Sequence, residues 1–494
     1  MGGGSAVEQS QCYEFRPGAA SAPLISGYRR REPETTVLHE VMREHLETFL
    51  AHIREDGRGL PRHVENELRK YIACGQLSEG FVRVVCHTCK DEMLVALSCK
   101  GRAFCPSCCT RRMHDTAALL VDRILPIAGH RQWVLSYPRK LRFLFARNSG
   151  AAGESARIFI REVFRWQRKQ ARRKGLKKPQ CGAVSFTQRF GSRVNLNLHH
   201  HAILPEGVFV EAEGAVRFEK LERPERSDLE RILERIVDKT LKMAKRRGRL
   251  EDEQPSDALA GLQLEAVQSG LPLPVWPTPP RGLSAFLLGF SLEAGAHVHE
   301  NDRAALEHLC RYGLRPPLAL SRLSRTSDGR VLLHLKRPMH DGTREVAFTP
   351  LQLIRRLAAL VPPARWNQTR YFGQFAGRAK LRRKVLPGSP PSTPKKSKGA
   401  EPAEPRTPYR LPWAQLLART FAIDVLLCPC GGLRKIIAFI PEPRIAQETL
   451  RRLGLPSAAA PLSPACWPSQ DEFELPREFD GTDPPFHEEV PEAS

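Results

Sequence analysis

Several features that define other classes of protein are missing from these 494 residues. The sequence has no uninterrupted apolar run of about 18 residues, so we expect no helix that crosses a membrane. Its first residues, MGGGSA, lack the basic and apolar regions of a secretory signal, and Ala6 stands where the N-myristoylation pattern needs serine or threonine. We therefore expect a protein of the cytoplasm.

The cysteines do not form the pattern of a disulfide framework. There are 13 of them, an odd number, and they gather at spacings typical of metal sites instead of being spread along the chain. This pattern predicts reduced thiols, which agrees with a cytoplasmic protein.

Acidic residues are scarce relative to basic ones. Lysine and arginine total 77 against 54 aspartates and glutamates, so the formal net charge is +23. Such an excess is typical of proteins that bind polyanions, most often nucleic acid. A basic surface that is merely solvated is the alternative.

The length of the chain predicts two to four domains, and shifts in composition suggest their boundaries. We expect a flexible Gly/Ala/Pro-rich N-terminus, a cysteine-rich domain, a large mixed domain with a Pro-rich connector near 271–282, a disordered linker, a small C-terminal unit and an acidic disordered tail. The corresponding ranges are 1–34, 35–125, 126–386, 387–411, 412–455 and 456–494.

The elements expected along the chain give an α+β fold with an antiparallel sheet, followed by a helical, basic C-terminal region. Residues 181–218 alternate between apolar and polar side chains and are interrupted by turn residues, which indicates hairpins. QWVLSY (132–137) indicates another strand. A further helix should begin at Asn301, whose side chain can cap it, and end before Pro316. Helices are also expected at 35–70, 112–127, 157–178 and 226–249.

The cysteine-rich block has the spacing of a structural zinc site. Cys86-x2-Cys89 and Cys105-x2-Cys108 are two knuckles that together supply four thiolates, enough for a closed tetrahedral site. Cys99 and Cys109 remain possible substitutes. Near the C-terminus, Cys428 and Cys430 are only one residue apart, which favours a structural remnant over a zinc knuckle.

Three consecutive histidines lie in NLNLHHHAILPEGVF (195–209). Because side chains in a strand alternate between faces, His200 falls among apolar residues and is expected to face the core. His199 and His201 share the other face, about 6–7 Å apart at Cα. Two imidazoles at that separation can bind one metal ion, although a surface histidine pair is the commoner case. His297 and His299 form a weaker candidate of the same kind.

A metal ion beside a basic surface can polarise a phosphate, and tyrosine is one nucleophile that could attack it. Among the seven tyrosines, Tyr312 lies near the end of the capped helix. His308 and Arg315 stand about one turn away on either side, and the guanidinium of Arg315 can bind the attacked phosphate. A tyrosine at this position is more often a packing residue. Tyr371 is the rival nucleophile.

Two segments with many basic residues suit single-stranded DNA, where aromatic side chains stack on bases and cations bind phosphates. The alternative is a solvated amphipathic surface. The residues we expect to contact DNA are Arg165, Trp166, Arg168, Lys169, Arg172, Arg173, Lys174, Arg382, Arg383 and Lys384.

Four motifs occur in a specific order: SCKGRAFCPSCCTRRM, NLNLHHHAILPEGVF, LCRYGLRPPL and QTRYFGQFA. Together they resemble the rolling-circle insertion-sequence transposases of the His-hydrophobic-His (HUH) single-strand nuclease superfamily, in the branch with an N-terminal zinc-binding domain. The resemblance covers roughly residues 40–455. It implies that residues 126–386 form an HUH nuclease domain, with about five antiparallel strands and the histidine pair on a central one.

The resemblance also implies the chemistry. His199 and His201 would bind Mg²⁺ or Mn²⁺, with Gln188 as the favoured third ligand. Tyr312 would attack single-stranded DNA at the ends of the element, leaving a 5′-phosphotyrosine and a free 3′-OH. A bacterial, nucleoid-associated location follows.

The sequence departs from the family pattern at two places. Many members carry two tyrosines four residues apart, but His308 occupies the first position here, so the chain resembles the single-tyrosine variant. The C-terminal cysteine knuckle is one residue shorter than usual. The competing interpretations are a rolling-circle replication initiator or relaxase-like nickase, and a non-catalytic zinc-dependent DNA-binding protein.

Overall fold

The computed structural model describes residues 31–55, 59–246, 257–268, 282–339, 342–387, 414–416, 419, 424–459 and 461–466. The Pro-rich connector, most of the N-terminus, nearly all of the linker and most of the acidic tail lie outside the described residues. A membrane span would need a longer and more apolar helix than any that the described residues form.

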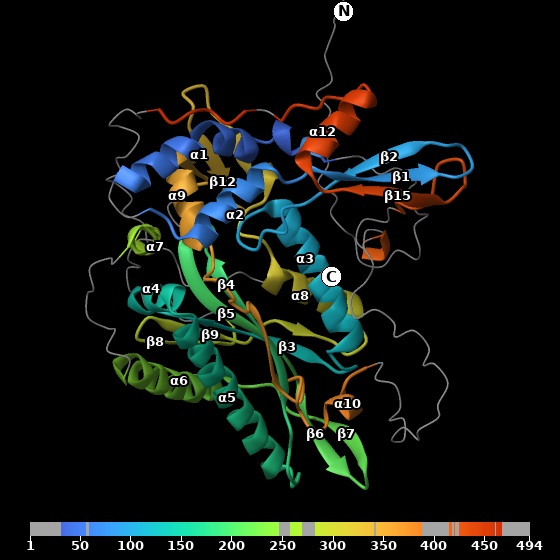
Figure 1. Ribbon diagram of the computed structural model, residues 1–494. Coiled ribbons are helices and arrows are strands. Elements are labelled where there is room, and N and C mark those ends of the chain that lie inside the picture. Colours follow the sequence, from blue (N-terminus) through green and yellow to red (C-terminus); the bar gives the residue numbers. More distant parts are fainter. Residues whose placement is uncertain are drawn as a thin grey trace, which may run out of the picture.

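A seven-stranded sheet in which all neighbouring strands are antiparallel forms the centre of the molecule (Figure 1). The strand order is β14-β4-β5-β3-β9-β8, and β10 also pairs with β3. β5 therefore has neighbours on both sides. The strands are β3 (His130–Ser136), β4 (Gly182–Phe190), β5 (Leu196–Pro205), β8 (Ser284–Leu287), β9 (Phe290–Glu293), β10 (His297–Val298) and β14 (Thr369–Gly373).

Helices cover both faces of this sheet. One face packs on α4 (Arg139–Arg147), α5 (Ser149–Arg173) and α6 (Arg226–Arg246), around a core that includes Trp133, Leu198 and Phe159. The other face packs on α3 (Pro106–Arg123), α8 (Arg303–Leu314) and α10 (Arg382–Val385). Because helices lie on both sides, nearly every side chain of β4 and β5 is buried, polar ones included.

A second core lies above one end of the sheet in Figure 1. It joins the N-terminal helices to a small antiparallel sheet of order β11-β12-β13. A separate two-stranded ribbon, β6-β7, extends from the other end. These elements are α1 (Val37–Glu55), α2 (Arg62–Ile72), α7 (Ala258–Gln268), α9 (Pro350–Leu360), β6 (Gly207–Ala212), β7 (Ala215–Lys220), β11 (Leu323–Arg325), β12 (Val331–His334) and β13 (Glu345–Phe348).

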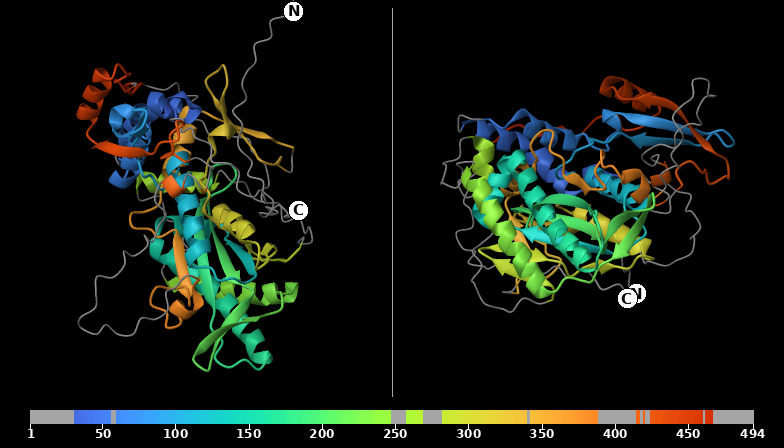
Figure 2. Two further views of the ribbon diagram at one scale, coloured as in Figure 1. Left: turned by 90° about the vertical axis from the view of Figure 1, so that its right-hand side faces the viewer. Right: turned by 90° about the horizontal axis from the view of Figure 1, so that it is seen from below.

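The C-terminal segment is not purely helical, which differs from the helical, basic C-terminal region predicted from the sequence. Its described part contains a strand, β15 (Arg434–Ile440), and a helix, α12 (Pro443–Arg452). β15 pairs with β1 (Phe81–Cys86), which in turn pairs with β2 (Glu92–Ala96). Figures 1 and 2 show this red strand beside the blue N-terminal strands. The segment therefore completes a sheet of the N-terminal region.

The predicted helix near residue 301 exists, but its cap is different. Asp302, not Asn301, is the N-cap of α8, and its carboxylate accepts a hydrogen bond from the backbone N–H of Ala305 (2.8 Å). The helix ends at Leu314, before the two prolines, as the sequence predicts.

Candidate functional site

The strand β5 separates the three histidines as its alternation predicts. His200 lies on the face covered by α4, α5 and α6, where its ring is within hydrogen-bond distance of Ser155 Oγ (3.2 Å) and Thr187 Oγ1 (3.1 Å). Its ring nitrogens are therefore engaged in the core. His199 and His201 lie on the opposite face, with their ring centroids 4.9 Å apart.

Both imidazoles of this pair are in the form that binds metal ions. Burial, together with the charge of Arg315 and against the opposing hydrogen bond with Asn197, lowers the pKa of His199 to about 4. Burial and the neighbouring His199 hold the pKa of His201 well below its usual range. Both rings are thus neutral near pH 7, and a neutral ring has a nitrogen lone pair for coordination.

Hydrogen bonds fix the orientation of His199 but not that of His201. The Nδ1 of His199 lies 2.9 Å from the carbonyl oxygen of Asn197, which can only accept, so Nδ1 carries the proton and Nε2 carries the lone pair. Neither ring nitrogen of the buried His201 has a hydrogen-bond partner among the described residues. Such a buried polar group is costly unless something else satisfies it.

Gln188 stands directly opposite His199 in the β4–β5 ladder, on the same face of the sheet. Its amide Nε2 donates to the backbone carbonyl of Tyr312 (2.9 Å), while its buried Oε1 finds no hydrogen-bond partner in the part of the chain that the structure describes. The side chain thus connects the histidine strand to the tyrosine helix and leaves an amide oxygen as a potential ligand.

The last turn of α8 places Tyr312 against the histidine pair. The rings of Tyr312 and His201 are 5.5 Å apart and nearly perpendicular. Arg315 is the C-cap residue of α8, and its guanidinium carbon lies 4.5 Å from the centre of the Tyr312 ring. Gly313 allows this approach, because a Cβ there would lie 2.5 Å from Phe186 on β4.

Four tyrosines lie in the described residues. Tyr71 and Tyr137 are buried in cores, and burial raises the pKa of each phenol, which makes both poor nucleophiles. Tyr371 is half-buried on β14, where it pairs with Val184. The strand β4 separates it from β5. Tyr312 is therefore the tyrosine that the fold brings against the histidine pair.

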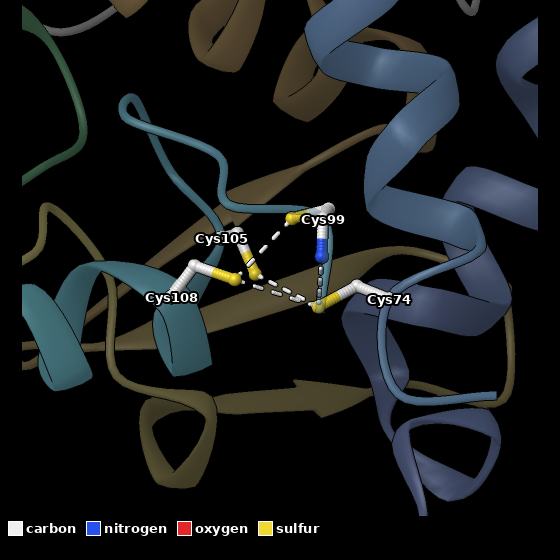
Figure 3. A group of neighbouring side chains, drawn as sticks. All are labelled: Cys74, Cys99, Cys105 and Cys108. Atoms are coloured by element: carbon white, nitrogen blue, oxygen red, sulfur yellow. Dashed lines mark hydrogen bonds between the residues drawn. The ribbon is translucent and has the colours of Figure 1, made fainter. Parts of the chain in front are cut away.

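The predicted zinc quartet is wrong, because the structure divides its cysteines between two clusters. Cys105 and Cys108 face Cys74 and Cys99, and Figure 3 shows the four sulfurs pointing toward one another. Cys86 and Cys89 lie instead beside Cys428 and Cys430. In both clusters all ligand sulfurs are within 4.8 Å of one another. Cys109, a possible substitute ligand, belongs to neither cluster and is buried.

The cluster of Cys74, Cys99, Cys105 and Cys108 fits a zinc ion. Adjacent sulfurs are 3.4–3.7 Å apart, and a Zn–S bond of about 2.3 Å gives a tetrahedron with corners about 3.8 Å apart. Cys105 and Cys108 lie at the N-terminus of α3, whose positive end stabilises thiolates.

Sequence reasoning missed Cys74 and considered Cys99 only as a substitute. Neither belongs to a Cys-x2-Cys pair. The one local signal at Cys74 is the glycine that follows it, which adopts a positive φ of 87°.

The predicted DNA-contacting residues lie on α5, on α10 and immediately after α5. Arg165, Lys169, Arg172, Arg173, Lys174, Arg383 and Lys384 are exposed, and Arg168 and Arg382 are half-buried. Trp166 was wrongly predicted to stack on DNA. It is only 9% exposed and packs against Trp133 with ring centroids 5.8 Å apart, so its ring belongs to the core.

The fold and the sites define a mixed helix and antiparallel-sheet protein with cysteine clusters suited to zinc. Comparison with known families is more specific. Residues 41–137 match a family described as "Transposase zinc-binding domain", of IS91 type, and residues 182–383 match a family described as "Putative transposase". The chain thus carries an IS91-type zinc-binding domain and a transposase domain, from which DNA binding and DNA transposition follow. No curated protein and no solved structure matches the chain.

Proposed function

We propose that the chain nicks and rejoins single-stranded DNA through a covalent bond to Tyr312, in rolling-circle transposition of an insertion sequence. The observation that carries this proposal is that the centre of the Tyr312 ring lies 5.5 Å from the centre of the His201 ring and 4.5 Å from the guanidinium carbon of Arg315. A candidate nucleophile, a candidate metal site and a cation that could bind a phosphate are thus neighbours in the fold.

His199, His201 and the Oε1 of Gln188 are the groups that would hold Mg²⁺ or Mn²⁺. The fit rests on two neutral imidazoles and on two buried side chains, His201 and Gln188, that retain unused polar atoms. A bound divalent ion would supply Lewis-acid polarisation of the DNA phosphate.

The proposed reaction exchanges one phosphodiester for another. The phenolic oxygen of Tyr312 forms a bond to phosphorus, and the bond between phosphorus and the 3′ oxygen of the preceding nucleotide breaks. The phenol releases a proton and the leaving 3′ oxygen takes one up. Because the number of phosphoester bonds is unchanged, the reverse attack by a 3′-OH rejoins DNA without ATP.

Arg315 has the position expected of a phosphate-binding group. Burial lowers its pKa to about 10, so the guanidinium remains charged at neutral pH. Burial and the charges of Arg315 and Arg322 lower the pKa of Lys336, which shows that positive charges crowd together here. A bound phosphate would relieve this repulsion.

A basic groove between α5 and α6 offers a path for single-stranded DNA. It has a volume of about 850 Å³, and one acidic residue, Glu154, lies among its lining side chains. Its cations are Arg157, Arg161, Lys239, Lys242, Lys245 and Arg246. The groove lies on the helical layer opposite to Tyr312, so DNA held in it would pass around the sheet to reach the nucleophile.

The experiment is a covalent-adduct assay with single-stranded oligonucleotides from the ends of the DNA element that encodes the protein. The oligonucleotide is labelled at its 3′ end, because that fragment would stay attached to the tyrosine. Tyr312→Phe should abolish the adduct, and the matched variant Tyr371→Phe should retain it. An adduct that survives Tyr312→Phe would reject the proposal, and a wild-type protein that forms none while binding DNA would favour a non-catalytic protein.

A further inference from the structure

Cys86 and Cys89, which take no part in the first cluster, form a second cluster with Cys428 and Cys430. This second cluster connects the N-terminal zinc-binding region to the C-terminal segment. Cys86 Sγ lies 3.6 Å from Cys430 Sγ, and Cys89 Sγ lies 3.5 Å from Cys428 Sγ. These separations again approach the edge of about 3.8 Å in a tetrahedral zinc–thiolate site. The two pairs are more than 330 residues apart in sequence, with Cys89 and Cys428 separated by 339 positions.

Each cysteine pair lies on a tight backbone turn shaped to present two sulfurs. Lys90, directly after Cys89, has a φ of 64°, and Gly431, directly after Cys430, has a φ of 84°. The next residue, Gly432, donates its N–H to Cys430 Sγ (3.4 Å). A Cβ on Gly432 would lie 2.9 Å from Cys86 Sγ, so glycine is needed for the turns to approach each other.

Contacts between the surrounding residues hold the two turns close together without a metal ion. β1 pairs with β15 along its full length, and Cys86 lies opposite Arg434. The buried Arg434 forms an ion pair with Asp91 (2.7 Å). A zinc ion with four thiolates has a net charge of −2, and the guanidinium of Arg434 would partly balance it.

We propose that Cys86, Cys89, Cys428 and Cys430 bind a second structural zinc ion, which fastens the C-terminal segment to the N-terminal zinc-binding domain. The four thiolates close the coordination sphere, so the site has no open position for substrate. Its role is to make the C-terminal segment part of the zinc-binding domain and to close the intervening transposase domain into a loop. This inference is independent of the reaction assigned to Tyr312.

The first test is the zinc content of the purified full-length chain. We expect two zinc ions per chain in the wild type, and one in the Cys430→Ser variant. The matched control is Cys466→Ser, because Cys466 is also exposed but belongs to neither cluster; this variant should retain two. A wild type with one zinc ion, or a Cys430→Ser variant with two, would overturn the proposal.

The second test is alkylation of native protein by iodoacetamide, followed by mass spectrometry, which does not depend on how well a variant folds. Cys89, Cys430 and Cys466 are all exposed. We expect Cys466 to react quickly, and Cys89 and Cys430 to react at least tenfold more slowly until zinc is removed by a chelator. Equal rates at the three positions would overturn the proposal. So would protection that a reducing agent alone abolishes, because that result indicates a disulfide.

Discussion

The substitution Gly313→Ala tests the contact that places Tyr312. An added Cβ would lie 2.5 Å from Cδ2 of Phe186, about 1 Å closer than ordinary van der Waals contact. Either α8 must move away from β4 or the Phe186 ring must turn within the core that contains Ile203 and Leu309. Overpacking of this kind costs about 1–3 kcal/mol, which exceeds the about 0.5–1 kcal/mol that alanine gains over glycine in a helix.

Two measurements follow from this geometry. Chemical denaturation should show a less stable Gly313→Ala protein, and covalent-adduct formation should fall on the order of 100-fold, because a displacement of about 1 Å at a reacting group has that effect. Phe186→Leu should restore part of both losses in the double variant. Gly261→Ala, on α7, is the control, because the added Cβ would meet no atom of the described residues within 4 Å. This variant should be more stable than the wild type. Equal stability and equal adduct formation in the two alanine variants would contradict this role of Gly313.

Three further predictions concern metal, salt and pH. Because imidazole ligands suit Mn²⁺ better than Mg²⁺, Mn²⁺ should support cleavage at least as well as Mg²⁺; activity in Mg²⁺ alone would contradict this. Affinity for single-stranded DNA should fall steeply as the salt concentration rises. Arg161→Glu should weaken binding more than Arg451→Glu, because Arg161 lines the groove and Arg451 lies on α12. An affinity that does not change with salt would contradict the proposal that DNA binds in the groove. Burial lowers the pKa of His130 to about 3. As the pH falls below about 6.5, His130 is therefore protonated in the unfolded chain before it is protonated in the folded protein. The free energy of unfolding should decrease between about pH 6.5 and 3 for this reason. Denaturant titrations at pH 7.5 and 5 should show a smaller decrease for His130→Gln than for the wild type.

The histidine and tyrosine positions could be predicted because they depend on short-range rules. Strand alternation assigns His199 and His201 to one face whatever the tertiary structure. The prolines after Leu314 fix the end of α8 and hence the position of Tyr312. That this helix lies beside β5 could be expected only from the family resemblance, because the strand and the helix are far apart in sequence.

The cysteine ligands could not be predicted in the same way. Knuckle spacing identifies pairs of ligands, but it does not say which pairs meet. Here Cys105 meets Cys74, 31 residues earlier, and Cys86 meets Cys430, 344 residues later. Pairing of β1 with β15 decides the second case, and a single strand at the end of the chain gives no local sign of its partner.

Trp166 could have been assigned correctly from the sequence. It lies three positions after Val163 and seven after Phe159, on the apolar stripe of α5, and all three are in the core. The basic residues around Trp166 led to the incorrect prediction that its ring stacks on DNA. The cations of α5 remain available for phosphate contact without it.

The role of Tyr312 as nucleophile is tested most directly by identifying the residue to which DNA becomes covalently attached. The covalent complex formed with single-stranded DNA would be digested with nuclease and protease, and the modified peptide identified by tandem mass spectrometry. We expect a nucleotide joined through its 5′ phosphate to Tyr312, in the peptide that follows Arg311. Modification of Tyr371 or of any other residue in its place would contradict it.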